Sequence, residues 1–194
     1  TNSVPLGMAM RYGTPSIESQ VLELSRLPNI DEILLVPLYP HYAESTIATT
    51  IAETERVLKK HALSIKLKTL KPFYDRPEYI EALVSSAQPW ISKPESYDHV
   101  LFSYHGLPEQ HITGTDPTGN HCLKQENCCS VSSSAHETCY RHQVFKTTEC
   151  FVKETGLKQE QYTIAFQSRL GRARWLEPST NDTLIELANA GVKN

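Results

Sequence analysis

Several features that would identify the class of a protein are missing from this sequence. No apolar run approaches the roughly 20 residues that a membrane-spanning helix needs. The first residues carry neither the basic nor the apolar stretch of a secretory signal. The formal net charge is only −3, which offers no basic surface for a nucleic acid. We therefore expect a globular protein without a nucleic-acid partner.

The common nucleotide and hydrolase motifs are also missing. The chain contains neither Gly-x-Gly-x-x-Gly nor Gly-x-x-x-x-Gly-Lys-Ser/Thr, so it signals neither a dinucleotide site nor a P-loop. Ser103 stands close to His105, but it lacks the Gly-x-Ser-x-Gly turn of the serine hydrolases. We find no internal repeat. The chemistry must therefore come from residues outside these motifs.

What the chain does contain is an alternation of strand-like and helix-like segments. The expected strands are residues 4–10, 33–38, 65–70, 99–104 and 162–166. The expected helices are residues 17–27 (capped by Ser16), 46–61 (capped by Ser45 or Thr46), 78–90, 137–154 (ended by Gly156) and 181–190 (capped by Thr180). This order predicts an α/β fold with parallel sheets and flanking helices. The continuous apolar run at 33–38 favours a strand that is buried on both faces.

The segment from Val100 to Pro108 organises the rest of the chain. Three apolar residues lead into Ser-Tyr-His-Gly, and Gly106 and Pro108 prevent a simple continuation of the strand. Ligands of open α/β sheets bind beyond the carboxyl ends of the strands. His105 is thus a candidate acid/base or metal ligand, although it could instead only cap the strand. Residues 106–136 show no sustained period and are expected to form a long loop.

Other polar and aromatic side chains follow the remaining strands. They combine aromatic rings with arginines and lack paired carboxylates, which suits a flat, apolar ligand with anionic edges. The alternative is that the rings only pack and the arginines are solvated. The members that we single out are Arg11, Tyr12, Tyr42, Gln167, Arg169 and Trp175.

Four of the five cysteines gather in one segment, as Cys122, Cys128, Cys129 and Cys139. Four thiolates can hold a zinc ion or a small iron–sulfur cluster, and the spacing does not choose between them. His121, His136 and His142 could replace one of the cysteines as ligands. Free thiols, or a disulfide formed on isolation, are the alternatives. Cys150 lies in a helical pattern and is expected to be a small apolar residue.

Several segments of the sequence together resemble those of the ferrochelatases, which insert ferrous iron into a porphyrin in haem biosynthesis. The resemblance extends over nearly the whole chain and in the family's order. Its blocks are Ser103–Glu109, Met10–Pro15, Pro37–Tyr42 with Ser45 and Thr46, Phe166–Gly171, and Trp175–Pro178.

The resemblance implies two Rossmann-like domains with the porphyrin cleft between them. Residues 1–71 would be the C-terminal part of the first domain, and residues 72–194 most of the second, with a cysteine-rich insertion at about 115–139. His105 would be the active-site histidine that binds iron, accepts pyrrole protons, or does both. Arg11, Tyr12, Tyr42, Gln167, Arg169 and Trp175 would contact the macrocycle. The four clustered cysteines would hold a [2Fe–2S] cluster, as in some bacterial members.

The resemblance also implies that parts of the enzyme lie outside this chain. The family's second active-site element, a glutamate in a His-x-Glu motif, is expected beyond Asn194, and the start of the first domain is expected before Thr1. Activity of the chain alone is therefore an open question. A cytoplasmic location, with peripheral membrane contact permitted, is the corresponding expectation. Two other functions stay open: a cobalt or nickel chelatase for another tetrapyrrole, and a non-catalytic iron–sulfur or zinc module. The sequence does not distinguish protoporphyrin from coproporphyrin.

Overall fold

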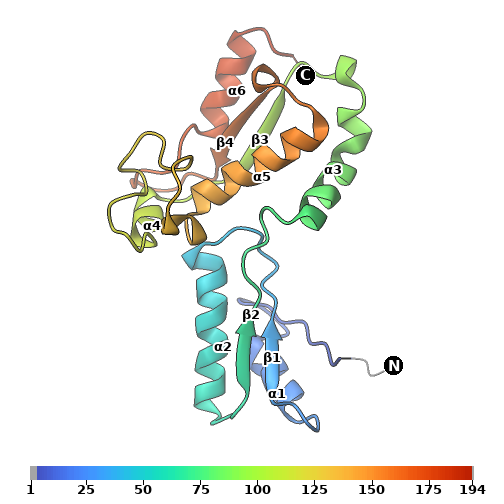
Figure 1. The fold of residues 1–194 in the computed structure, drawn as a ribbon, viewed down its shortest axis with the longest axis vertical. Helices are drawn as coiled ribbons and strands as arrows, with labels where there is room; N and C mark the ends of the chain where they lie inside the picture. The colour runs from blue at the N-terminus through green and yellow to red at the C-terminus, as the bar shows by residue number, and fades with distance from the viewer. Residues whose placement is uncertain (1–3, 194) are drawn as a thin grey trace. The chain divides into compact units, whose positions relative to one another are not determined.

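The computed structural model describes residues 4–193 and has an α/β fold. Its contacts divide the chain into two compact units, Thr1–Pro72 and Phe73–Asn194. Each unit is built around a pair of parallel strands (Figure 1). The expected parallel βαβ arrangement is thus confirmed. Within the described part of the chain, no helix has both the length and the apolar character needed to cross a bilayer.

The first unit pairs strand β1 with strand β2 and packs two helices against them. Its elements are α1 (Ile17–Ser25), β1 (Glu32–Leu35), a π-helical turn (Glu44–Ala48), α2 (Thr49–Lys60) and β2 (Lys66–Thr69). The buried core consists of Ile17, Val21, Val57 and Leu58, with Ile33, Leu63, Ile65 and Leu67 packed against it. Ser16 caps α1 as expected, because its hydroxyl accepts a hydrogen bond from the backbone N–H of Ser19.

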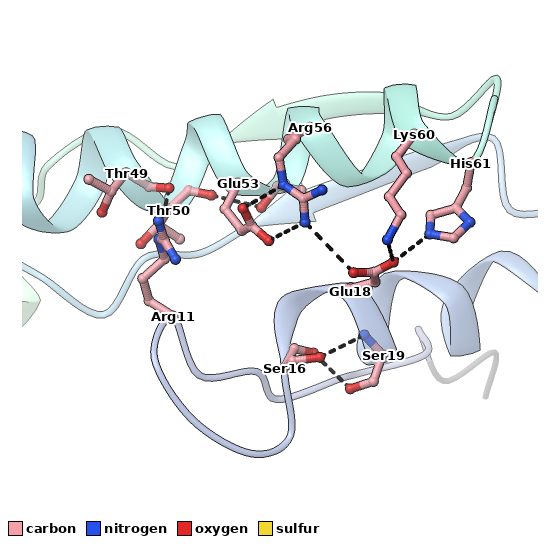
Figure 2. Close-up of polar contacts among 11 residues, drawn as sticks. Arg11, Ser16, Glu18, Ser19, Thr49, Thr50, Glu53, Arg56, Lys60 and His61 are labelled. Carbon is pink, nitrogen blue, oxygen red and sulfur yellow. Dashed lines mark hydrogen bonds and ion pairs between the residues drawn. The ribbon is translucent and has the colours of Figure 1, made fainter.

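One carboxylate links the two helices of the first unit (Figure 2). Glu18 of α1 lies 2.6 Å from the Lys60 ammonium of α2 and 2.6 Å from the ring of His61, which follows α2. Arg56 approaches the same carboxylate at 3.7 Å. The hydrogen bond from Lys60 is the main reason that the pKa of Glu18 falls from its ordinary 4.5 to about 2, and the contact with His61 lowers it further.

This low pKa predicts an acid-sensitive contribution to stability. The folded form holds Glu18 ionised more strongly than the unfolded form does, so its contribution is complete above pH 4.5 and is lost as the pH falls toward 2. Glu18→Gln should therefore cost stability near neutral pH but little at low pH. We expect its urea midpoint to lie closer to that of the wild type at about pH 3 than at about pH 6. Glu55→Gln changes an exposed carboxylate of α2 that has no ion pair within residues 4–193, and it should show no such convergence.

The second unit surrounds strands β3 and β4. Its elements are α3 (Pro77–Ile91), β3 (Val100–His105), α4 (Glu109–Gly114), α5 (Tyr140–Thr155), β4 (Tyr162–Gln167) and α6 (Thr180–Asn189), with short 3₁₀ turns at Pro94–Ser96, Ser134–Glu137 and Gln159–Gln161. Helix α5 crosses the sheet and packs against α3, while α6 packs against β4 (Figure 1). The ring of Phe102 on β3 meets Phe151 of α5 at 5.3 Å, edge to face. Gly156 ends α5 with a left-handed φ of 73°, as its position predicts.

Several local predictions were wrong. Residues 4–10 form no strand, and Val4 and Leu6 are 88% and 96% exposed, because their apolar side chains have no neighbouring strand within residues 4–193. Strand β1 ends at Leu35, before Pro37, and not at residue 38 as expected. Its side chains alternate between exposed and half-buried, so the strand is covered on one face and not on both.

Two caps and one helix also differ from the sequence-based expectation. Neither Ser45 nor Thr46 caps a helix, because both lie inside the π-helical turn. Ser179, and not Thr180, caps α6, since its hydroxyl accepts the N–H of Asp182. The stretch expected to be loop contains the short helix α4, in which only Ile112 is fully buried.

Candidate active site

The carboxyl ends of β3 and β4 lie side by side and bring His105 next to Gln167. The two residues are register partners in the parallel ladder, one step beyond the pair of Tyr104 and Phe166. The chain then turns at Gly106, whose N–H donates to the carbonyl of Gln167 at 2.7 Å. Within residues 4–193 the exposed His105 ring has no hydrogen-bond partner. The imidazole is therefore presented to solvent on a fixed backbone.

The segment that carries Trp175 is pinned to the turn after His105. Pro108 and Trp175 form an antiparallel bridge, and the N–H of Leu176 donates to the carbonyl of Leu107 at 2.9 Å. The indole N–H of Trp175 donates to the carbonyl of Leu170 at 2.9 Å, which fixes the ring within its own loop. The flat face of Trp175 is thus held close to the strand ends by several independent bonds.

A small pocket of about 10 Å³ lies at these strand ends. His105 itself does not line it, but its neighbour Gly106 does. The lining residues are Gly106, Phe166, Gln167, Arg169, Trp175, Leu176, Glu177 and Ser179. Arg169 is exposed and has no ion-pair partner in the part of the chain that the structure describes, so its guanidinium is available to an anionic group. The pocket therefore combines an aromatic wall with a free cation.

The other predicted contacts belong to the first unit. The guanidinium of Arg11 lies 4.4 Å from the centre of the Tyr12 ring and donates from Nε to the carbonyl of Thr49 at 3.1 Å. Tyr12 is 77% exposed, so its outer face is open. Tyr42 is half-buried, and burial, together with the charge of Glu44, raises the pKa of its phenol. Burial also lowers the pKa of the adjacent His41 to about 4, which keeps that ring neutral.

The four clustered cysteines meet in the loop that precedes α5. Cys122, Cys128 and Cys139 are buried, all of the cysteines are free thiols, and Cys139 affects the pKa of both Cys122 and Cys129. Chiefly because of the neighbouring Cys129 thiol, the pKa of Cys139 lies below its usual range, although burial opposes the shift. Burial raises the pKa of Cys122, and donation to Cys139 raises that of Cys129. Cys139 also caps the positive end of α5, which favours its thiolate.

The histidines of this loop support the cysteines through the backbone. His121 and His136 each place Nε2 on the carbonyl of Cys128, at 2.7 and 2.9 Å, and His142 places Nδ1 on the carbonyl of Cys129 at 2.8 Å. The rings of His136 and His142 are stacked, 3.6 Å apart. These contacts use one nitrogen of each ring, so the histidines brace the backbone of the cysteine loop in this arrangement. Among residues 4–193, no three acidic, histidine or cysteine side chains already form a ready metal-binding group.

Three residues of this region were missed in the sequence analysis. Asp116 accepts four hydrogen bonds: two from Thr118, and one each from the N–H groups of His121 and Cys122. Burial would raise its pKa, but these bonds lower it well below its usual range. Arg141 lies 3.4 Å from the sulfur of Cys129, and the hydroxyl of Tyr140 donates to the carbonyl of His105 at 2.8 Å. Only the short Asp-x-Thr turn signal could have indicated Asp116, because the other two contacts are made across the fold.

Comparison with known proteins links these features to one family. The family model described as ferrochelatase matches residues 1–194. A ferrochelatase of Stutzerimonas stutzeri (strain A1501) and one of Pseudomonas fluorescens (strain Pf0-1) are each 50% identical to this chain over 190 residues, which is 97% of it. A ferrochelatase of Pseudomonas aeruginosa (strain LESB58) is 46% identical over 189 residues. The chain spans about half the length, 55%, of these curated relatives.

Proposed function

This chain belongs to the ferrochelatase family, and on that premise we propose that it serves the insertion of ferrous iron into a porphyrin in haem biosynthesis. The observation that carries the proposal is His105, an exposed imidazole at the carboxyl end of β3 on a backbone fixed from both sides. An imidazole can accept a proton or bind a metal near neutral pH. Metal insertion needs both actions, because two pyrrole protons must leave as the iron enters.

The side chains around the small pocket beside His105 suit a porphyrin lying across the strand ends. Trp175 offers a flat apolar surface, and Arg169 offers a free guanidinium that could pair with a propionate. Arg11 and Tyr12 of the first unit form a second aromatic and cationic pair, and Tyr42 and Gln167 complete the proposed contacts. Binding energy from the faces and propionates of the ring would support a bent macrocycle, in which the pyrrole nitrogens are accessible to the metal.

Segments beyond this chain are part of the proposal. Since the relatives are almost twice as long, we propose that further N- and C-terminal segments of the same enzyme complete the cleft and supply the second active-site element. The location that we propose is the cytoplasm, with peripheral membrane contact permitted. This last point rests on the family resemblance alone.

A panel of macrocycles and metals tests the proposed function. Protoporphyrin and coproporphyrin are titrated into this chain, and binding is followed by the shift of the Soret band. Insertion of ferrous iron, cobalt and nickel is then measured anaerobically in protein extended to the length of the relatives. We expect porphyrin binding and a preference for ferrous iron. A preference for cobalt or nickel with a reduced tetrapyrrole would assign the chain to another chelatase class, and metal content without porphyrin affinity would reduce it to a metal-binding module.

We also propose that the four clustered cysteines hold a [2Fe–2S] cluster. The chemistry of the donors suits such a cluster, because four cysteines share one largely buried loop. Three histidines brace the backbone of this loop, and two of its sulfurs receive hydrogen bonds from Leu123 and Arg141. When bound, such a cluster supplies a cross-link between the loop and α5 and a one-electron redox centre. Its sulfurs lie on a loop outside the porphyrin pocket, so we assign it no step in insertion.

Asp116 provides the test of the cluster, since it organises the loop without contributing sulfur. Protein prepared anaerobically should contain about two irons and two sulfides per chain and show visible charge-transfer bands. Asp116→Ala removes four hydrogen bonds at the start of the loop, and we expect it to lower the iron content by more than half. Asp182→Ala, the same change on α6, should leave the iron content as in the wild type. A colourless protein with one zinc ion would contradict the cluster but not the proposed chelatase.

A further inference from the structure

One turn of helix contacts both the cysteine loop and the backbone of His105. Helix α5 begins directly after Cys139, and its first three residues turn toward different partners. Tyr140 donates its hydroxyl to the carbonyl of His105 at 2.8 Å, while Arg141 donates to the sulfur of Cys129 and His142 contacts the carbonyl of the same cysteine. The first turn of α5 therefore contacts both the cysteine loop and the backbone of His105.

The carbonyl that Tyr140 contacts belongs to a peptide group that is held at both ends. Its C=O accepts the phenol of Tyr140, and its N–H, which is that of Gly106, donates to the carbonyl of Gln167 at 2.7 Å. Within residues 4–193 the His105 ring has no hydrogen-bond partner of its own. The backbone that carries the imidazole is thus fixed by two hydrogen bonds of this peptide group, and one of the two comes from α5.

The position of the first turn of α5 depends in turn on the cysteine loop. Thr115 and Thr138 close the loop by reciprocal bonds, with the hydroxyl of Thr138 on the carbonyl of Thr115 at 2.6 Å and that of Thr115 on the carbonyl of Thr138 at 3.3 Å. Cys139 follows directly and occupies the N-cap position of α5, but its side chain makes no hydrogen bond to the helix. First turns without such a cap fray. Ligation of Cys139 would hold this turn in place.

We propose that Tyr140 is a positioning residue that couples the occupancy of the four-cysteine site to the backbone at His105. The inference rests on the proposed cluster and on the proposed role of His105. With the site filled, the first turn of α5 is fixed and the phenol stays on the His105 carbonyl. With the site empty, the turn opens more often and the peptide after His105 is released. The cysteine site thereby regulates the reaction centre without touching the macrocycle.

Amide hydrogen exchange at Gly106 tests this coupling without any measurement of activity. The chain is reconstituted anaerobically with ferrous iron and sulfide, and a second sample is stripped with EDTA under reducing conditions. Loss of one hydrogen bond of this kind changes the opening equilibrium by on the order of fivefold. We therefore expect stripping to speed the exchange of Gly106 by about fivefold in the wild type.

Tyr140→Phe removes only the hydroxyl. In this variant the loaded protein should already exchange Gly106 about fivefold faster than the loaded wild type, and stripping should add less than twofold, because the connection is already broken. The matched control is Tyr162→Phe, which removes a hydroxyl that bonds Gln159 at the far end of β4. This control should respond to stripping as the wild type does.

Three results would overturn the coupling. One is stripping that changes exchange within residues 122–139 but not at Gly106. The second is a Tyr140→Phe protein that responds to stripping as strongly as the wild type. The third is a chain that takes up no iron and sulfide.

The comparison of loaded and stripped wild-type protein decides the question even if the Tyr140→Phe variant does not fold. Porphyrin titration of the same samples separates this outcome from the proposed function, because coupling without porphyrin binding would contradict only the latter.

Discussion

Replacing His105 with alanine is expected to slow iron insertion by about 100- to 10,000-fold, the range typical of a lost proton-transfer group. The imidazole is exposed at the end of β3, and its removal leaves the strand pairing and the turn after it intact. Porphyrin affinity should therefore change far less than the rate. The measurement is a steady-state insertion assay, with ferrous iron and porphyrin each varied, in protein extended to the length of the relatives.

The control histidine lies at the other end of the same strand. His99 precedes β3 and places Nε2 on the hydroxyl of Thr163 at 2.9 Å, away from the pocket. His99→Ala should retain most of the insertion rate. If His105→Ala kept more than half of the wild-type rate, neither proton transfer nor iron binding could be assigned to its ring.

The second large effect is expected at Gly106, where the backbone passes closest to the pocket wall. A β-carbon on this residue would lie 2.7 Å from the carbonyl oxygen of Gln167 and 3.3 Å from Cε3 of Trp175. The carbonyl cannot move without breaking the bond from the Gly106 N–H. Gly106→Ala should therefore destabilise the protein by about 1–3 kcal/mol, the usual cost of overpacking. It should also weaken porphyrin binding, because it displaces Trp175.

Urea unfolding and porphyrin titration measure both parts of this prediction. Gly114→Ala is the matched control, since a β-carbon at the end of α4 would meet no atom within 4 Å. We expect that variant to be as stable as the wild type or slightly more so, because alanine is the better helix former. If Gly106→Ala were as harmless as Gly114→Ala, the turn after His105 would accommodate a β-carbon, which contradicts the close contacts in the structure.

The sequence was most informative where the chemistry depends on strand order. Parallel strands end at the same edge, so the βαβ pattern predicted that His105 and Gln167 share an edge, and the structure adds that their strands are direct neighbours. Gly156 and Ser16 marked the end of one helix and the start of another for equally local reasons. The gathering of the four cysteines was expected because they are close in sequence.

Contacts made across the fold could not be predicted. Nothing local distinguishes Tyr140 from other tyrosines, and its contact with His105 spans 35 positions of sequence. The apolar character of residues 4–10 indicated a strand, but a strand needs a partner, and the described residues offer only the bridge from Met10 to Ser16. The histidines near the cysteines looked like ligands, whereas the structure directs their nitrogens to backbone carbonyls. Residue type alone cannot show which atom a ring will face.

The most direct test of the central claim is to map where a porphyrin binds. Amide hydrogen exchange is followed in this chain with and without protoporphyrin. The account predicts protection at residues 105–108 and 167–176, around His105 and Trp175, and none at β1 and β2 of the first sheet. Binding that leaves residues 105–108 and 167–176 unprotected, or no binding at all, would contradict it.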